Sequence, residues 1–152
     1  MRTLKVWVPT NRVDEKGRYT HVDGWNEIIE ANRSGYRVGA IQERDNVQHV
    51  ALWTSLAMQR QRWPVMTKER AVPCKVTITF VERDRRRDVG NVHGGSKYAL
   101  DGLTHRHRYG AGAIYDDSQR WLPKIEYRIG YVGETHEEPG IEITITTLEE
   151  QA

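Results

Sequence analysis

The 152-residue sequence contains very little cysteine and no long hydrophobic run, and each absence excludes a class of protein. Cys74 is the only cysteine, which excludes an internal disulfide and a zinc site built from several cysteines. No stretch approaches the roughly 20 apolar residues that a membrane-spanning helix needs. The first ten residues lack the apolar centre of a secretory signal peptide. We therefore expect a soluble, intracellular protein with no membrane partner.

The composition fits one globular domain, with 38% hydrophobic and 29% charged residues. The formal net charge of only +2 hides an uneven distribution of charge along the chain. Acidic residues collect near the C-terminal end. Positive charge gathers in the middle, at Arg83, Arg85, Arg86 and Arg87, with Lys97, Arg106 and Arg108 nearby. We therefore expect one basic face although the total charge is nearly zero.

The hydrophobic pattern predicts a single α+β domain over residues 1–152. Alternating and β-branched residues predict strands at Leu4–Val8, Lys75–Val81, Trp121–Tyr131 and Ile141–Thr147. Apolar spacing predicts two main helices, at Glu43–Trp63, which stops before Pro64, and at Ser96–Thr104, with Ser96 as its N-cap. Residues 11–42 are punctuated by glycine, and we expect an irregular, mobile loop region with one or two helical turns at Trp25–Ala31. The prediction is a mixed sheet of about four strands packed with two helices.

Two short segments combine the charges that phosphodiester chemistry needs. The first is Arg85-Arg86-Arg87-Asp88-Val89-Gly90-Asn91, and the second is Tyr115-Asp116-Asp117-Ser118-Gln119. Converging carboxylates can hold a hard divalent cation through oxygen, and arginines at the rim can accept a polyanion. Together they favour a magnesium-dependent DNA-cutting enzyme.

Simpler interpretations exist for each of these residues. Asp88 after an arginine run could be a surface acid in an ion pair. Asp116 and Asp117 could form a plain turn before the last strands. Lys97 could be a solvated helix residue, and Asp101 could cap or pair locally. The arginines alone could be a solvated face, but beside two acids that bind metal they are better explained by phosphate contact.

The order and spacing of these motifs over Val76–Thr146 resemble the RusA family of Holliday junction resolvases, which is common in prophages. That family has a strand leading into an arginine-rich Asp-x-Asp-Asn motif, then a lysine and a short helix, then an Asp-Asp-x-Gln motif and closing strands. The corresponding segments here are Arg85–Asn91, Lys97–Thr104, Ala113–Gln119 and Pro139–Thr146. The resemblance covers about half of the chain and implies a RusA-like fold and a bacterial or phage-encoded, cytoplasmic protein.

By this resemblance the first essential aspartate of the family falls on Asp88, its lysine on Lys97, and the essential acid of its Asp-Asp pair on Asp117. Gly90 stands where the family has its second aspartate, and about three residues are inserted before Lys97. Another ligand would then replace the missing carboxylate, and the candidates, in order of preference, are Asp116, Asn91 and His93. An imidazole suits Mn²⁺ better than Mg²⁺.

The resemblance also implies the role of each residue. Asp88 and Asp117 would bind Mg²⁺, with Mn²⁺ as a substitute, and Lys97 would stabilise charge in the transition state. Phosphate contacts would come from Arg83, Arg85, Arg86, Arg87, Arg106 and Arg108. Paired nicks in a two-fold symmetric four-way junction need two sites, which implies a homodimer.

Three alternatives to a resolvase stay open at this point. The first is a protein of the same fold that binds branched DNA but cuts weakly or not at all, because Gly90 marks a lost metal ligand. The second is a nuclease for other branched or single-stranded DNA. The third is a small structural protein with a fortuitous charge pattern, which would show no salt-sensitive DNA affinity.

Overall fold

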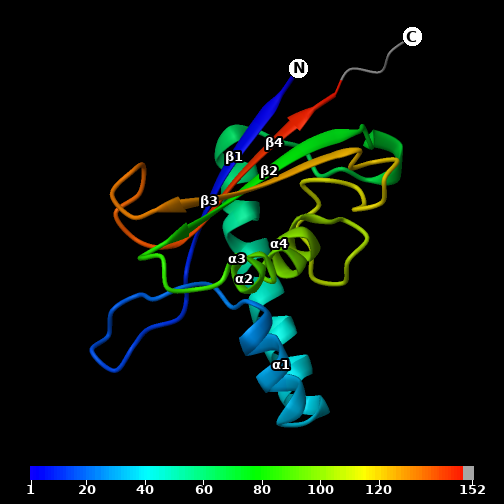
Figure 1. Cartoon of the computed structure of the whole chain (residues 1–152). Coiled ribbons are helices and arrows are strands. Elements are labelled where there is room, and N and C mark those ends of the chain that lie inside the picture. Colours follow the sequence, from blue (N-terminus) through cyan, green and yellow to red (C-terminus); the bar gives the residue numbers. More distant parts are fainter. Residues whose placement is uncertain (149–152) are drawn as a thin grey trace.

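Four strands form one mixed sheet in the order β1-β4-β2-β3. They are β1 (Thr3–Pro9), β2 (Cys74–Glu82), β3 (Lys124–Tyr131) and β4 (Gly140–Thr147). β4 pairs antiparallel with both β1 and β2, and β3 pairs parallel with β2. This computed structural model describes residues 1–148, and Figure 1 shows the sheet crossing the upper half of the molecule.

The sequence predicted all four strands, and the α+β fold with a mixed four-stranded sheet is confirmed. The largest difference is at β3, which begins at Lys124 and not at Trp121, while the other strand ends agree to within one residue. The backbone N–H groups of Trp121 and Leu122 both donate to the carbonyl of Ser118 and form a turn. Pro123, which has no N–H to donate to a ladder, then separates this turn from the strand.

The core lies between one face of the sheet and the helices. β1, β2 and β4 alternate along their length, so that the side chains of one face are fully buried, as for Val6, Ile78 and Ile143. Val50 and Met58 of α2 and Leu103 of α4 belong to the same buried cluster. The free thiol of Cys74 is also buried there, as the sequence indicated.

The helices are α1 (Trp25–Arg33), α2 (Tyr36–Gln61), α3 (Val89–His93) and α4 (Ser96–Leu103), with a 3₁₀ turn at Lys68–Arg70. α1 and the N-terminal half of α2 extend away from the sheet, at the bottom of Figure 1. The helical turns expected at Trp25–Ala31 are confirmed as part of α1, whereas the prediction of an irregular region was wrong for residues 36–42, which belong to α2. α2 begins seven residues before the predicted Glu43, and the N-cap of α4 is Gly95 and not Ser96.

Gly39 explains why the start of α2 was missed. This glycine marked a loop in the sequence, yet it lies within α2. A Cβ at Gly39 would lie 2.0 Å from Oδ1 of Asn32 on α1. The glycine therefore permits α1 to pack directly on α2.

The segment between β1 and α1 is fixed to α2 by a buried carboxylate. Asp23 is 1% exposed and accepts two hydrogen bonds from the Arg12 guanidinium, at 2.8 and 2.6 Å. The side-chain amides of Gln42 and Asn46 donate to the same carboxylate at 3.0 and 2.9 Å. Burial alone would raise the pKa of Asp23, but these hydrogen bonds outweigh it and hold the pKa below its ordinary value. Among the described residues no helix is long and apolar enough to cross a membrane.

Candidate active site

α4 places Asp101 and Lys97 together, because residues four apart lie on one side of a helix. The other side of α4 is buried in the core through Tyr98, Ala99 and Leu103. At Gly102 the backbone of α4 lies directly against α2, since a Cβ there would be 2.5 Å from Cγ1 of Val50. This close approach holds Asp101 next to α2, which carries Glu43.

The segment after α4 turns back on itself and brings two more groups to the same place. The N–H of His105 donates to the carbonyl of Ile114 at 2.9 Å, and the N–H of Arg106 donates to the carbonyl of Tyr115 at 3.2 Å. A backbone bridge between Thr104 and Ile114 joins the same two stretches. Residues 105–107 and 114–117 therefore run side by side next to the end of α4.

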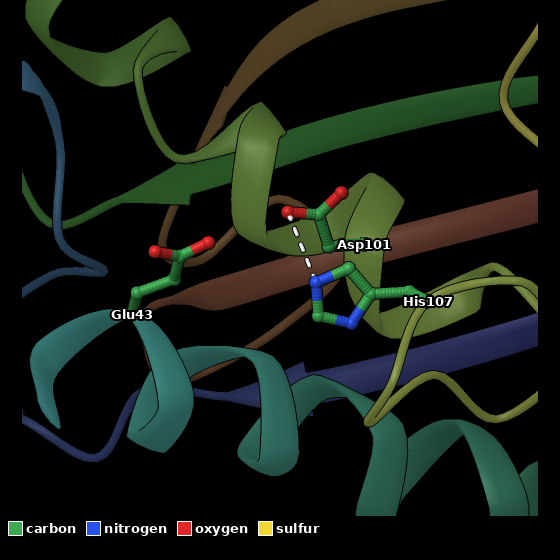
Figure 2. Close-up of side chains that lie close together, drawn as sticks. All are labelled: Glu43, Asp101 and His107. Atoms are coloured by element: carbon green, nitrogen blue, oxygen red, sulfur yellow. Dashed lines mark ion pairs between the residues drawn. The ribbon is translucent and has the colours of Figure 1, made fainter. Parts of the chain in front are cut away.

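Three side chains from three elements converge at this point (Figure 2). Glu43 comes from α2, Asp101 from α4 and His107 from the loop after α4, and one ligand atom of each lies within 4.8 Å of the others. Nε2 of His107 is 3.8 Å from Oδ2 of Asp101. Nζ of Lys97 is 3.9 Å from Oε1 of Glu43, so a lysine partly balances the acids.

The hydrogen bonds of His107 indicate which ring nitrogen carries a proton. The backbone N–H of Tyr109 donates to Nδ1 of His107 at 3.2 Å, so Nδ1 acts as an acceptor. A neutral ring then carries its proton on Nε2, which faces Asp101. Metal coordination through Nε2 would require the opposite tautomer and the loss of the Tyr109 bond. His107 is therefore better suited to donate a hydrogen bond through Nε2 than to bind a metal.

An open cavity of about 360 Å³ adjoins this group and contains both aspartates of the Asp-Asp motif. Its walls are Asp101, Thr104, Arg106, His107, Asp116 and Asp117. Nη1 of Arg106 is 3.6 Å from Oδ2 of Asp116, while Asp117 is exposed. The cavity thus presents three carboxylates with one guanidinium at its rim.

The crowding of acids has a measurable consequence for Asp101. Burial raises the pKa of Asp101 above its ordinary value, and the negative charges of Asp117 and Glu43 raise it further. His107 and Lys97 lower it, but by less than the total increase. A bound cation would relieve both the desolvation and the repulsion.

The donor set suits a hard divalent cation. Carboxylate oxygens are the ligands that Mg²⁺ and Mn²⁺ prefer, and those of Asp101, Asp116 and Asp117 line one cavity. Glu43 stands next to Asp101 from the side of α2. Among the described residues, the ligand atoms that lie within 4.8 Å of one another are those of Glu43, Asp101 and His107, and Asp116 and Asp117 add carboxylates from the adjoining cavity.

The other predicted acid, Asp88, lies elsewhere in the chain. It is exposed and precedes α3, thirteen residues before Asp101, and it does not line the cavity. Within residues 1–148 its carboxylate makes no hydrogen bond or ion pair. The structure therefore brings Lys97, Asp116 and Asp117 together around Asp101 but does not bring Asp88 to them.

The two side chains considered beside Asp88 have structural partners. The side-chain oxygen of Asn91, predicted as a metal ligand, accepts a hydrogen bond of 2.8 Å from the backbone N–H of Asn26 in the first turn of α1. The ring of His93 lies between those of Phe80 and Tyr127, with centroids 5.9 and 5.6 Å away. Both therefore serve the packing around α3.

The predicted phosphate-binding arginines fall into two groups. Arg106 and Arg108 flank His107 in the sequence: Arg106 lines the cavity, and the guanidinium of Arg108 lies 5.2 Å above the ring of Tyr109. The other group, from Arg83 to Arg87, follows β2 and precedes Asp88.

The four arginines after β2 already have partners within the chain. Arg83 donates to the Tyr19 carbonyl at 2.7 Å, and the partly buried Arg87 pairs with Glu82 at 3.1 Å. Arg85 lies 4.4 Å above the ring of Tyr131. Arg86, which pairs with Asp84 at 3.7 Å, is 90% exposed and is the most available of the four for a phosphate.

Sequence reasoning missed three members of the cluster. Asp101 was interpreted as a local pairing residue, while Glu43 and His107 were not identified as site residues. The basic loop around His107 gave a weak signal, since a histidine stands between two arginines close to the Asp-Asp motif. Glu43 gave none, because its proximity to Asp101 depends on the packing of α2 against α4.

Comparison of the chain with protein-family models gives no match, and comparison with curated proteins gives none either. The functional argument therefore depends on the geometry of the site and on the motifs in the sequence.

Proposed function

We propose that this protein is a divalent-metal-dependent endodeoxyribonuclease that cuts branched DNA, with the Holliday junction as its substrate. The observation that carries the proposal is the cavity that Asp101, Asp116 and Asp117 line together with His107 and Arg106. The Asp-Asp motif was selected from the sequence as a metal-binding pair, and the fold places it next to other acids. The resemblance of the motifs to the RusA family supplies the choice of substrate.

Each side chain has a part in phosphodiester hydrolysis. Asp101 and Asp117 would hold Mg²⁺ or Mn²⁺, with Glu43 supporting from α2. The metal, when bound, would act as a Lewis acid on the phosphate and make water a better nucleophile. Attack by that water breaks the bond between phosphorus and the leaving oxygen.

The positive groups around the cavity serve the phosphate. Arg106 stands at the rim and can neutralise one of its oxygens, and the ammonium group of Lys97 adds charge from the side of Glu43. His107 carries its proton on Nε2 in the tautomer described above and can donate a hydrogen bond from Nε2 to the leaving oxygen, which takes its proton from solvent. In this scheme Arg108 and Arg86 contact flanking phosphates and carry no sequence information.

Two cuts at symmetric positions of a four-way junction require two such sites. A homodimer with two-fold symmetry meets this requirement and belongs to the proposal. The protein would then nick both strands in one complex, in recombination and repair of DNA.

A second candidate function has specific support. Gly90 replaces an aspartate of the family motif, and Asp88 lies outside the acidic cavity. Both facts favour a protein of the same fold that binds branched DNA and cuts it slowly or not at all. Such a protein would bind junctions equally well with and without metal.

Cleavage of a synthetic four-way junction separates these functions. The proposal predicts paired nicks with Mg²⁺ or Mn²⁺, none with EDTA, and loss of cleavage in Asp101→Asn with junction affinity retained. Glu69→Gln, which changes an exposed acid on the 3₁₀ turn, is the matched control and should cut normally. Tight binding without nicks under either metal supports the second candidate instead.

A further inference from the structure

A second hollow, of about 340 Å³, lies on the other side of the active-site cluster. It is bounded by α2 through Ala40, Ile41 and Arg44, and by the loop after α4 through Arg108 and Tyr109. Its volume falls in the range of about 300–1,000 Å³ that small-molecule pockets occupy. The hollow is therefore large enough for one nucleotide.

The hollow and the acidic cavity are adjacent. His107 lines both, and Glu43, which stands beside Asp101, lines the hollow as well. A group bound in the hollow would thus lie next to a phosphate bound at the aspartates of the acidic cavity. In a DNA strand that neighbour is the nucleotide beside the cut bond.

The lining of the hollow offers an apolar surface for the base of a nucleotide and positive charge for its phosphate. One wall is apolar, since Ile41 is 47% exposed there and the ring of Tyr109 adjoins it. The cations are two arginines. Within residues 1–148, Arg44 pairs only with its neighbour Asp45, at 3.3 Å, and Arg108 lies over Tyr109. Bases stack on aromatic rings and arginine planes, and guanidinium groups bind phosphate.

We propose that this hollow is a subsite for one unpaired nucleotide of DNA, adjacent to the cut phosphate, with its base against Tyr109 and Ile41 and its phosphate on Arg44 and Arg108. A base within a duplex cannot reach such a site without leaving its stack. The subsite would therefore direct cleavage to places where strands separate, such as the centre of a junction. This inference rests on the proposed function, and it names the form of DNA that the site selects.

The test measures stacking directly, in EDTA, with a short single-stranded oligonucleotide that carries the fluorescent base 2-aminopurine. Wild type should quench the fluorescence, and Tyr109→Leu should weaken binding about fivefold or more. Tyr36→Leu, which changes a 91% exposed tyrosine at the start of α2, is the matched control and should behave as wild type. Arg108→Gln, on an exposed side chain, gives a second variant that removes the guanidinium over Tyr109 but keeps the tyrosine ring itself. It should weaken oligonucleotide binding and reduce its salt dependence.

Equal quenching and affinity in Tyr109→Leu, Arg108→Gln and wild type would overturn the subsite. So would normal metal-dependent cleavage by these variants with an unchanged preference for unpaired over fully paired DNA. Failure of the nuclease proposal would look different, because quenching that depends on Tyr109 would persist while no metal supports cleavage. Absence of both quenching and cleavage in wild type would overturn the two proposals together.

Discussion

Replacement of Gly102 by alanine tests how the site is assembled. A Cβ at this position would lie 2.5 Å from Cγ1 and 2.6 Å from Cβ of Val50, and 3.2 Å from the backbone nitrogen of Ala51. These contacts are too short, so α4 would have to move away from α2. Overpacking of a core typically costs about 1–3 kcal/mol, and the short contacts place this case near the upper end. Alanine regains about 1 kcal/mol in helix propensity, which leaves a net loss of about 2 kcal/mol.

Urea denaturation followed by circular dichroism measures this free energy of unfolding. Gly90→Ala is the matched control, because Gly90 also lies in a helix but its new Cβ would meet no atom within 4 Å. That variant should be as stable as wild type or slightly more stable. Gly102→Ala should also slow metal-dependent cleavage, since the movement separates Asp101 from Glu43.

A double-mutant cycle locates the effect at Val50. Val50→Ala removes Cγ1, the nearest atom to the new Cβ, but keeps the Cβ of residue 50 at 2.6 Å, so the two changes together should cost about 1 kcal/mol less than the sum of the single changes. Additive effects would show that the two side chains do not meet. A stabilising Gly102→Ala would refute the packing of α4 on α2 on which the site depends.

Three further predictions concern single ionisable groups. Asp23→Asn should destabilise the protein at neutral pH, by less than the ~3–5 kcal/mol typical of a broken buried pair because Arg12 is half exposed. Because the pKa of Asp23 is lower in the folded state, its carboxylate contributes to stability above the unfolded pKa near 4, and this contribution is lost as pH falls through the folded pKa. The free energy of unfolding of the variant, measured by urea denaturation, should therefore depend less on pH below about 4 than that of wild type. Burial raises the pKa of the Cys74 thiol to about 11, so iodoacetamide should label it only as fast as the protein unfolds, and rapid labelling of native protein would contradict this. Asp117→Asn should lower the pKa of the Asp101 carboxyl in an NMR titration, because one negative neighbour is removed, and an unchanged value would place Asp117 outside the cavity.

The sheet could be predicted from the sequence because its pattern is local. Residues of β2 and β4 alternate between buried, mostly β-branched and partly exposed side chains over most of their length. Helical turns at Trp25–Ala31 were predicted and belong to α1, but the start of α2 could not be predicted in the same way. Val38 and Ile41 are exposed and give no apolar stripe, and Gly39 resembles a loop residue until the packing of Asn32 is known.

The candidate site likewise contains residues that a local motif predicts and residues that only the packing brings together. The Asp-Asp motif was visible because its two acids are adjacent, and the structure places both in one cavity. The first arginine block gave an equally visible signal, yet most of its guanidinium groups pair with acids, a carbonyl or a ring of the same chain. Glu43 and His107 join Asp101 through the packing of α2, α4 and the following loop, which no short motif encodes.

The central claim is that the cavity of Asp101, Asp116 and Asp117 is a metal-dependent site for cutting branched DNA. The most direct test is cleavage of a four-way junction by wild type and Asp117→Asn with Mg²⁺, Mn²⁺ or EDTA. The account predicts paired nicks that require metal and fall about 100-fold or more in the variant, with junction binding retained. Equal cleavage by the variant, or junction binding without cleavage under either metal, would contradict it.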